Sequence, residues 1–227
     1  MMNKHYAEEF AQKGYTIINS LFSNEEVIQL KQEALAIVNK IDDIDNSGVF
    51  LGLTSRSQLF KQAAANQELV NALKEIIGSY VVFMNDKLVF KNSTKNFGSP
   101  WHQDYPYWQG SHKYSVWIAL DDATKENGCL QVVPGSHLFG EKNHGADSSD
   151  GLGFVNRLHQ EDIDKDLVID LPAKQGDAII FHDLLYHASY PNISGADRWA
   201  LISTYKDGTQ EDPEYKWASA AFTVSEA

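Results

Sequence analysis

Residues 167–205 read LVIDLPAKQGDAIIFHDLLYHASYPNISGADRWALISTY and carry the clearest strand signals in the chain. Short runs rich in Val, Ile, Leu, Phe, Trp and Tyr alternate here with polar turn residues, a texture typical of antiparallel sheets. We predict strands at 167–171, 178–181 and 199–205, and turns at 174–177 and 192–195. No helical pattern separates these strands.

The same texture starts at residue 80 and continues through the middle of the chain. Further strands are predicted at 81–90, 115–120 and 128–133, and further turns at 96–98 and 134–136. Because helices come first and no regular β-α alternation follows, the pattern argues against a doubly wound parallel sheet. We predict a mainly β fold with N-terminal helices, in the form of an antiparallel sandwich or jelly roll.

Two amphipathic segments make up the predicted helical part. Ser23 and Glu26 form a capping box ahead of apolar positions that share one helix face, namely Val27, Leu30, Leu35 and Val38. A second helix is predicted from about 58 to 77, ending at Gly78. The 227 residues are expected to form a single domain, with helical support over about 1–79 and the jelly-roll core over about 80–210.

Composition limits the class of partner. The 19 basic and 31 acidic residues give a formal charge of −12, which repels nucleic acid, although a local basic pocket could override the global sign. No apolar run is long enough to span a membrane, and residues 1–15 lack the apolar core of a signal peptide. Cys129 is the only cysteine, so no internal disulfide forms and the cytoplasm is the expected compartment. The oligomeric state stays open.

The first candidate site residues lie in Trp101-His102-Gln103-Asp104, where a strand is expected to begin. In an extended chain, residues i and i+2 point to the same side, so His102 and Asp104 project together while Gln103 faces away. An imidazole and a carboxylate placed in this way suit one metal ion. Taken alone, such a tripeptide is also common among solvated loop residues.

A second half of the site is predicted about 80 residues downstream. A strand is expected to end at His187 and a new one to begin at Arg198, so antiparallel pairing would bring these two side chains close together. Two histidines and one carboxylate form the facial triad of non-haem Fe(II) oxygenases, and a buried arginine offers a two-pronged donor for a carboxylate. His182 competes with His187 as third ligand, but five residues separate them, so in a regular strand they face opposite ways. The remaining candidates are interpreted as ordinary loop or turn histidines: His112, His137, His144 and His159.

Taken in order, these segments resemble the phytanoyl-CoA dioxygenase family of Fe(II)/2-oxoglutarate-dependent oxygenases over nearly the whole chain. The matching segments are residues 9–18 as the opening strand, residues 21–27 as the first helix cap, WHQDYPYW at 101–108, VWIALDDATKENGCLQVVPGSH at 116–137, and FHDLLYHASYPN at 181–192 with Arg198. The resemblance implies a double-stranded β-helix, also called a jelly roll or cupin-like core, with helices packed on one side.

The resemblance also implies roles for individual residues. His102, Asp104 and His187 match the family's iron ligands, and Arg198 matches the arginine that pairs with the distal carboxylate of 2-oxoglutarate. Ser189 matches a hydroxyl that contacts the same carboxylate, and Trp117 matches a pocket tryptophan; alternatively, these two are a turn serine and a core aromatic. The implied cofactors are Fe(II), 2-oxoglutarate and O₂, with ascorbate as reductant in vitro.

Several further residues are candidates for binding the substrate. Tyr105, Tyr107 and Trp108 directly follow Asp104, so they are candidates for the wall of a substrate pocket or, alternatively, plain core aromatics. The polar, glycine-rich stretch 143–153 is a candidate lid. Arg157, just after it, is a candidate partner for an acidic substrate group or a surface charge.

The predicted reaction is hydroxylation of an aliphatic C–H of a small metabolite, such as an amino acid or a natural-product intermediate, with release of succinate and CO₂. Related halogenases carry a small residue in place of the carboxylate ligand, so Asp104 favours hydroxylation over halogenation. Desaturation, epoxidation and cyclisation stay open, because the same oxidant performs them. Two other classes compete: a non-catalytic cupin-like binder, and a Zn²⁺ hydrolase or isomerase with the same ligands. Neither needs Arg198.

Overall fold

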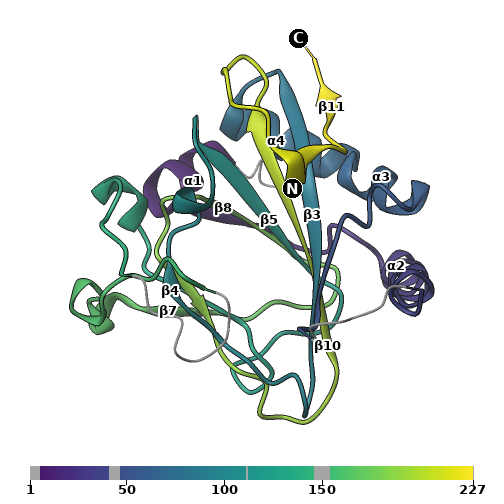
Figure 1. Ribbon diagram of the computed structural model, residues 1–227, viewed down its shortest axis with the longest axis horizontal. Helices are drawn as coiled ribbons and strands as arrows, with labels where there is room; N and C mark the ends of the chain where they lie inside the picture. Colours follow the sequence, from purple (N-terminus) through teal and green to yellow (C-terminus); the bar gives the residue numbers. More distant parts are fainter. Residues whose placement is uncertain (1–5, 41–46, 111, 146–153, 227) are drawn as a thin grey trace.

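Two antiparallel sheets face each other in the computed structural model, which describes residues 6–40, 47–110, 112–145 and 154–226. The larger sheet has the order β1-β8-β5-β10-β3-β11, with β2 also paired to β3, and the smaller sheet has the order β4-β9-β6-β7. Figure 1 shows β5, β10 and β3 side by side through the middle, with β4 and β7 to their left. The larger sheet comprises β1 Tyr15–Ile18, β2 Val49–Leu51, β3 Val81–Lys91, β5 Lys113–Ala119, β8 Ala178–His182, β10 Arg198–Asp207 and β11 Phe222–Ser225. The smaller sheet comprises β4 Ser99–His102, β6 Leu130–Val132, β7 Ile169–Leu171 and β9 His187–Ser189.

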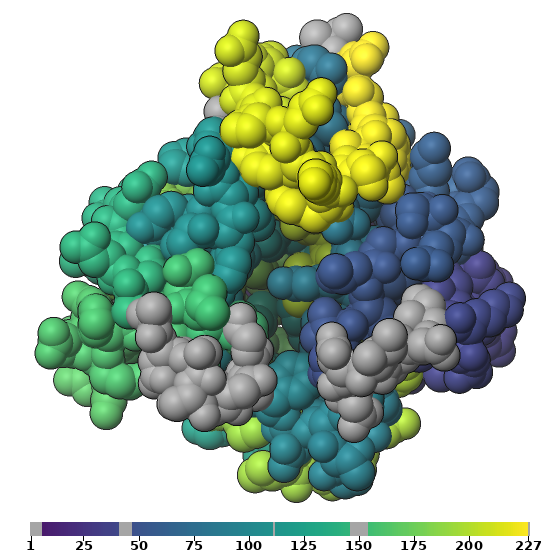
Figure 2. All heavy atoms as spheres, viewed as in Figure 1, coloured from purple at the N-terminus to yellow at the C-terminus, as the bar shows by residue number. Residues whose placement is uncertain are grey.

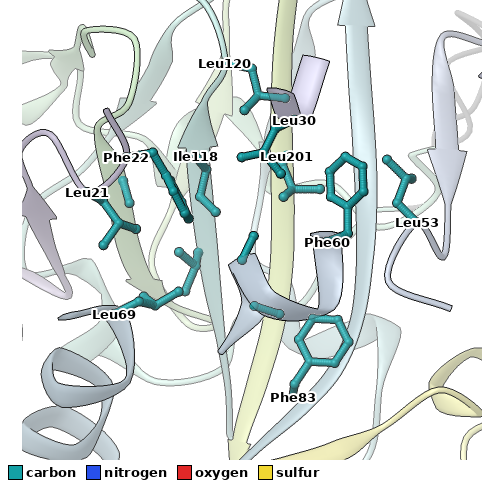
Figure 3. Close-up of a cluster of buried hydrophobic side chains, with 14 of the residues drawn as sticks. Leu21, Phe22, Leu30, Leu53, Phe60, Leu69, Phe83, Ile118, Leu120 and Leu201 are labelled. Atoms are coloured by element: carbon teal, nitrogen blue, oxygen red, sulfur yellow. The ribbon is translucent and has the colours of Figure 1, made fainter. Parts of the chain in front are cut away.

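One face of the larger sheet packs against the helices. Strand alternation sends Leu88, Ile118 and Leu201 to this face, where they meet apolar side chains of the helical segment. Figure 3 shows Leu30 and Phe60 of the helices close to Ile118 and Leu201 of the strands. The helices are α1 Tyr6–Lys13, α2 Asn24–Val38, α3 Gln58–Ala64 and α4 Gln67–Ile77. This packing confirms the predicted helical support on one side of a jelly roll.

The other face of the larger sheet points toward the smaller sheet. Trp117, Ile179 and Phe181 lie on this side and form a second apolar cluster with Leu130 and Val132 of the smaller sheet. The cluster fills only part of the space between the sheets. The rest is lined by polar and charged side chains, which form the site described below.

The capping box that begins the first predicted helix is present. The Ser23 side chain accepts a hydrogen bond from the backbone N–H of Glu26, and the Glu26 carboxylate accepts one from the backbone N–H of Ser23. The second predicted helix is instead two helices, so this part of the prediction was wrong. The side-chain oxygen Oδ1 of Asn66 accepts hydrogen bonds from the backbone N–H groups of Glu68 and Leu69, which caps the start of α4 and separates it from the preceding helix.

The sheets also take strands from outside the segment 80–210 that was predicted as the jelly-roll core, among them the opening strand expected within residues 9–18. β1 and β2 come from the N-terminal part and β11 from the C-terminal end. In the opening segment 9–18, only β1 is a strand, because residues 9–13 belong to α1. The strand predicted at 167–171 starts later, at Ile169, since a 3₁₀ turn occupies Lys165–Leu167. Among the described residues, no helix is both long and apolar enough to cross a bilayer.

Candidate metal centre and its cavity

Three predicted ligands converge between the two sheets. His102 ends β4, His187 begins β9, and the two are direct partners in the antiparallel register. The Nε2 atoms of His102 and His187 lie 3.6 Å and 3.7 Å from Asp104 Oδ1. All three side chains are buried, and their donor atoms lie within 4.8 Å of one another. Bonds of about 2.0 to 2.2 Å from a central divalent ion fit this spacing.

Hydrogen bonds behind the ligands set their orientation. His102 Nδ1 donates to the Pro100 carbonyl at 2.8 Å and His187 Nδ1 to the Leu185 carbonyl at 2.9 Å, so each Nε2 keeps its lone pair toward the centre. Ser115 Oγ donates to Asp104 Oδ2 at 2.9 Å, which leaves Oδ1 facing the two imidazoles. Such supporting bonds are typical of metal sites.

The protonation states match a ligand set ready for a cation. Burial, and next the neighbouring His102 ring, lower the pKa of His187 to about 4, so its imidazole is neutral at pH 7. Burial opposes ionisation of Asp104, but the adjacent His187 and His102 rings outweigh it and lower the pKa of this carboxyl. Neutral imidazole and ionised carboxylate are the metal-binding forms. The residues therefore fit a divalent ion with three positions left open.

The local reason for the convergence differs from the one predicted. β4 ends at His102, and Asp104 lies beyond it in a right-handed helical conformation at the start of the 3₁₀ turn Tyr105–Tyr107. The chain turns here because the backbone N–H of Asp104 donates to the Asp183 carbonyl at 2.8 Å. Gln103 faces away, as predicted, and its amide donates to the carbonyls of Gly140 and Leu184. The extended His-x-Asp geometry was therefore wrong, although the two ligands meet.

His182 belongs to a separate cluster. Its Nδ1 lies 2.9 Å from Asp183 Oδ1, and His112 Nδ1 lies 3.4 Å from the same oxygen. β8 ends at His182, and a turn carries the chain to His187 in the other sheet. The geometry thus groups His187, and not His182, with Asp104.

Arg198 lies at one end of the same cavity. Its side chain is 1 % exposed, and Nε and Nη2 donate to the carbonyls of Asn127 and Gly128. Nη1 is buried with no hydrogen-bond partner in the described part of the chain. The guanidinium carbon lies 5.7 Å from the centre of the Trp117 ring. An unsatisfied buried donor is costly unless a ligand pairs with it, so this end of the cavity suits an anion.

Arg198 and His187 do not meet through paired strands, which corrects the predicted hairpin. β9 lies in the smaller sheet and β10 in the larger one, so the two side chains reach one cavity from opposite walls. A jelly roll crosses between its sheets at such turns.

Lys91 is a residue that the sequence analysis missed. It is the direct partner of Arg198 in the register of β3 and β10, is 1 % exposed, and donates from Nζ to Ser189 Oγ at 2.9 Å and to the Tyr190 carbonyl at 2.8 Å. Burial, and next the charge of Arg198, lower its pKa to about 6. The available signal was the alternation Lys87, Val89, Lys91 against apolar neighbours, which placed these lysines on the interior face.

The cavity has a volume of about 790 Å³ and contains most of the predicted site. The face in view in Figure 2 is hollowed between the teal and blue parts of the chain. The cavity is lined by His102, Asp104, Tyr107, Trp108, Trp117, His187, Ser189 and Arg198, and by residues not predicted, among them Lys87, Lys91, Lys95, Ser115, Phe154 and Phe181. A second cavity, of about 590 Å³ near Thr54 and Phe222, contains none of the predicted site residues.

Two of the predicted substrate residues lie elsewhere. Tyr105 is not in the cavity lining, and its hydroxyl donates to the Lys142 carbonyl at 2.6 Å. Arg157 is also outside the lining, and its Nε donates to the Phe154 carbonyl at 2.7 Å. Within the predicted lid at 143–153, residues 146–153 lie outside the described residues; Gly145 forms a bridge with Arg157.

Comparison with known proteins agrees with this architecture. Peroxisomal phytanoyl-CoA dioxygenase of Rattus norvegicus is 29% identical to this chain over 178 residues, which cover 74% of this chain and 49% of the relative. L-proline trans-4-hydroxylase of Streptomyces griseoviridis is 28% identical over 162 residues, which cover 60% of this chain and 59% of the relative. The chain therefore spans about half the length of these two relatives. The epimerase SnoN, solved with Fe³⁺, alpha ketoglutarate and nogalamycin RO, superposes with a TM-score of 0.77 at 18% identity, covering 93% of this chain and 86% of that one. The family model described as phytanoyl-CoA dioxygenase (PhyH) matches residues 10–200, so the chain belongs to the phytanoyl-CoA dioxygenase family.

Proposed function

We propose that this protein is an Fe(II)/2-oxoglutarate-dependent dioxygenase that hydroxylates an aliphatic C–H of a small metabolite. One observation carries the proposal: a buried two-histidine, one-carboxylate cluster shares a cavity with a buried arginine whose Nη1 lacks a partner among the described residues. A binder without turnover or a zinc hydrolase needs the cluster but not the arginine. The combination supports a keto-acid oxygenase.

In this proposal the chain's residues have separate tasks. His102, Asp104 and His187 would hold the ferrous ion, and Arg198 and Lys91 would bind the distal carboxylate of 2-oxoglutarate. When bound, Fe(II) and 2-oxoglutarate would activate O₂ for C–H hydroxylation, with succinate and CO₂ as products. Ser189, which already accepts from Lys91, would keep that ammonium group pointed at the carboxylate.

The rest of the cavity would place the substrate and exclude water. Phe154 packs edge-on against His102, with ring centres 4.9 Å apart, and Tyr107 and Trp108 add to the same lining. About 790 Å³ must hold both 2-oxoglutarate and the substrate, which favours a compact molecule. The name of the L-proline trans-4-hydroxylase relative supports an amino acid or a molecule of similar size. The described residues would thus act as one catalytic domain.

The decisive experiment is formation of succinate from 2-oxoglutarate under air, with Fe(II) and ascorbate present. The purified protein is expected to form succinate slowly alone and faster with its substrate. Asp104→Ala is the matched control, because it removes the only carboxylate of the cluster and should reduce the rate to that of free iron. Equal rates for both proteins would refute the proposed function.

Lys91→Met is expected to make the ligand-free protein more stable and to weaken 2-oxoglutarate binding. The folded-state pKa of about 6 lies below the unfolded value of 10.5, so between these values unfolding takes up a proton and the lysine favours the unfolded state. At about pH 8 the buried lysine lowers the free energy of unfolding of the wild type by roughly 3 kcal/mol. The variant regains this amount but loses two hydrogen bonds of about 1 kcal/mol each. The unfolding midpoint should therefore rise by about 2 to 4 °C, as measured by calorimetry.

The same variant should bind 2-oxoglutarate about 10- to 100-fold more weakly, because the bound carboxylate would raise the pKa of Lys91 and pair with its protonated amine. Lys165→Met, at an exposed lysine in the 3₁₀ turn before β7, is the control and should change neither quantity. A lower unfolding midpoint in Lys91→Met, or unchanged affinity, would contradict the role given to this lysine.

A further inference from the structure

Lys87 is a cavity-lining cation that the proposed reaction does not use. β3 directs Lys87, Val89 and Lys91 to the cavity, while Leu88 between them points to the helices. Lys91 has two hydrogen bonds, whereas Lys87 has neither a hydrogen bond nor an ion pair with any residue that the structure describes. Its side chain is half-buried. An ammonium group held in this position without a protein partner suits an anionic ligand.

The sheet register separates Lys87 from the 2-oxoglutarate end of the cavity. Lys87 lies opposite Ile202 of β10, four residues from the Lys91–Arg198 pair. At about 3.3 Å per residue, the two lysines are about 13 Å apart along the strand. The distal carboxylate of 2-oxoglutarate bound at Arg198 would therefore lie too far away to pair with Lys87.

Lys87 also lies near the metal ligands. Ser115, which holds Asp104, lies on β5, and β10 runs between β5 and β3 in the same sheet, so two strand spacings of about 4.8 Å each separate the strand of Ser115 from that of Lys87. Lys87 is close enough to Asp104 and His187 for its charge to contribute to lowering the pKa of both. A group bound to Lys87 would thus lie beside the iron site.

The charges of the cavity contrast with those of the whole chain. The protein has a net charge of −12, yet the described residues that line the cavity include Lys87, Lys91, Lys95 and Arg198 and one carboxylate, that of Asp104. The Asp104 carboxylate and the carboxylate of 2-oxoglutarate next to its keto group would bind the metal, and the distal carboxylate would pair with Arg198 and Lys91. Positive charge would remain at the Lys87 end, and a recessed site of one sign concentrates ions of the other sign.

From this arrangement we propose that Lys87 forms an anion subsite for the primary substrate. The inference rests on the proposed function and makes the substrate class more specific: a small organic acid, with a carboxylate or another acidic group on Lys87. The less polar body of the acid would lie against Tyr107, Trp108 and Phe154, in reach of the metal. A lysine suits this task because its ammonium is a compact charge that accepts acidic groups of several geometries.

Equilibrium binding tests this subsite without turnover. The protein is loaded with Fe(II) and saturating 2-oxoglutarate under argon, and ligands are titrated while the total tryptophan fluorescence is recorded, to which the cavity residues Trp108 and Trp117 contribute. The probes are matched pairs of aliphatic and cyclic carboxylic acids and their carboxamides, for example cyclohexanecarboxylate and cyclohexanecarboxamide. These pairs have nearly the same shape and differ in charge, so the ratio of their dissociation constants reports the subsite.

The wild type is expected to bind acids about 10- to 100-fold more tightly than amides. Lys87→Met should bring this ratio to about one, Lys87→Arg should retain most of it, and the exposed Lys165→Met should leave it unchanged. Binding of neither member, equal binding of both, or a preference that persists in Lys87→Met would overturn the proposal; the last outcome would place the acid at Lys91 and Arg198. Absence of 2-oxoglutarate binding or of succinate formation would instead refute the proposed function, because the acid preference is measured separately.

Discussion

Replacement of His187 by alanine is expected to abolish ferrous-ion binding and succinate formation, whereas His182→Ala should retain both. His187 supplies one of three donor atoms that lie within 4.8 Å of one another. A water molecule in the space left by alanine would not be held in the position and orientation of the imidazole nitrogen. Loss of a supporting hydrogen bond alone costs a metal site about 10- to 100-fold in affinity, so loss of a ligand should cost more. Metal content after dialysis and succinate formation are the two measurements.

His182→Ala is the matched control, because it removes an imidazole from the same segment of chain. His182 contacts Asp183 and His112, so its loss should affect local stability and leave the triad in place. Circular dichroism of both variants would show that the fold is kept. Iron bound by His187→Ala but lost from His182→Ala would mean that the ligand assignment is wrong.

The sequence predicted which three side chains come together in the candidate metal centre better than it predicted the backbone that positions them. His102 and Asp104 were expected to project from one strand, but the strand ends at His102 and a turn anchored on the Asp183 carbonyl brings Asp104 back. That anchor comes from a residue about 80 positions away, so no local pattern reveals it. Side-chain chemistry is visible in a sequence, whereas a tertiary hydrogen bond is not.

The assignment of strands to the two sheets was also beyond what a local sequence pattern can predict. Apolar alternation predicts β3, β5, β8 and β10 well, because each strand has one face on an apolar cluster. Alternation does not say which strands pair, so β9 and β10 were expected to form a hairpin although they belong to different sheets. Asn66 is a local signal of a helix start and was available in the sequence, but the apolar spacing across it suggested one continuous helix.

The charge of the cavity could not be predicted from composition. Net charge describes the whole surface, and this chain is acidic, yet the register of two neighbouring strands pairs Lys91 with Arg198 and places Lys87 on the same wall of the cavity. The cost of burying Lys91 and Arg198 is visible in their lowered pKa values, about 6 and about 10. Among the described residues, neither side chain forms an ion pair with a carboxylate, so this end of the cavity is suited to an anionic ligand.

Replacement of Arg198 by methionine is expected to weaken 2-oxoglutarate binding by about 30-fold to 1,000-fold or more, while Fe(II) binding stays within about twofold. Truncation of one partner of a buried charged pair costs about 2 to 5 kcal/mol, which gives this range. The guanidinium lies on the wall opposite His187 and donates only to backbone carbonyls, so the metal ligands keep their own hydrogen bonds. Calorimetric titration of the Fe(II) protein under argon measures both affinities.

The chemistry of the keto acid supplies the control for this prediction. 2-Oxobutyrate has the same carboxylate and keto oxygens for the metal but lacks the distal carboxylate, so it should bind the wild type and Arg198→Met with similar affinity. The affinity of Arg198→Lys for 2-oxoglutarate should fall between those of the wild type and Arg198→Met, because lysine keeps the charge and loses the two-pronged donor. Equal loss of affinity for both keto acids would show that Arg198 holds the shape of the site rather than the far carboxylate. Loss confined to 2-oxoglutarate would separate a keto-acid oxygenase from a cupin-like binder, which has no use for that interaction.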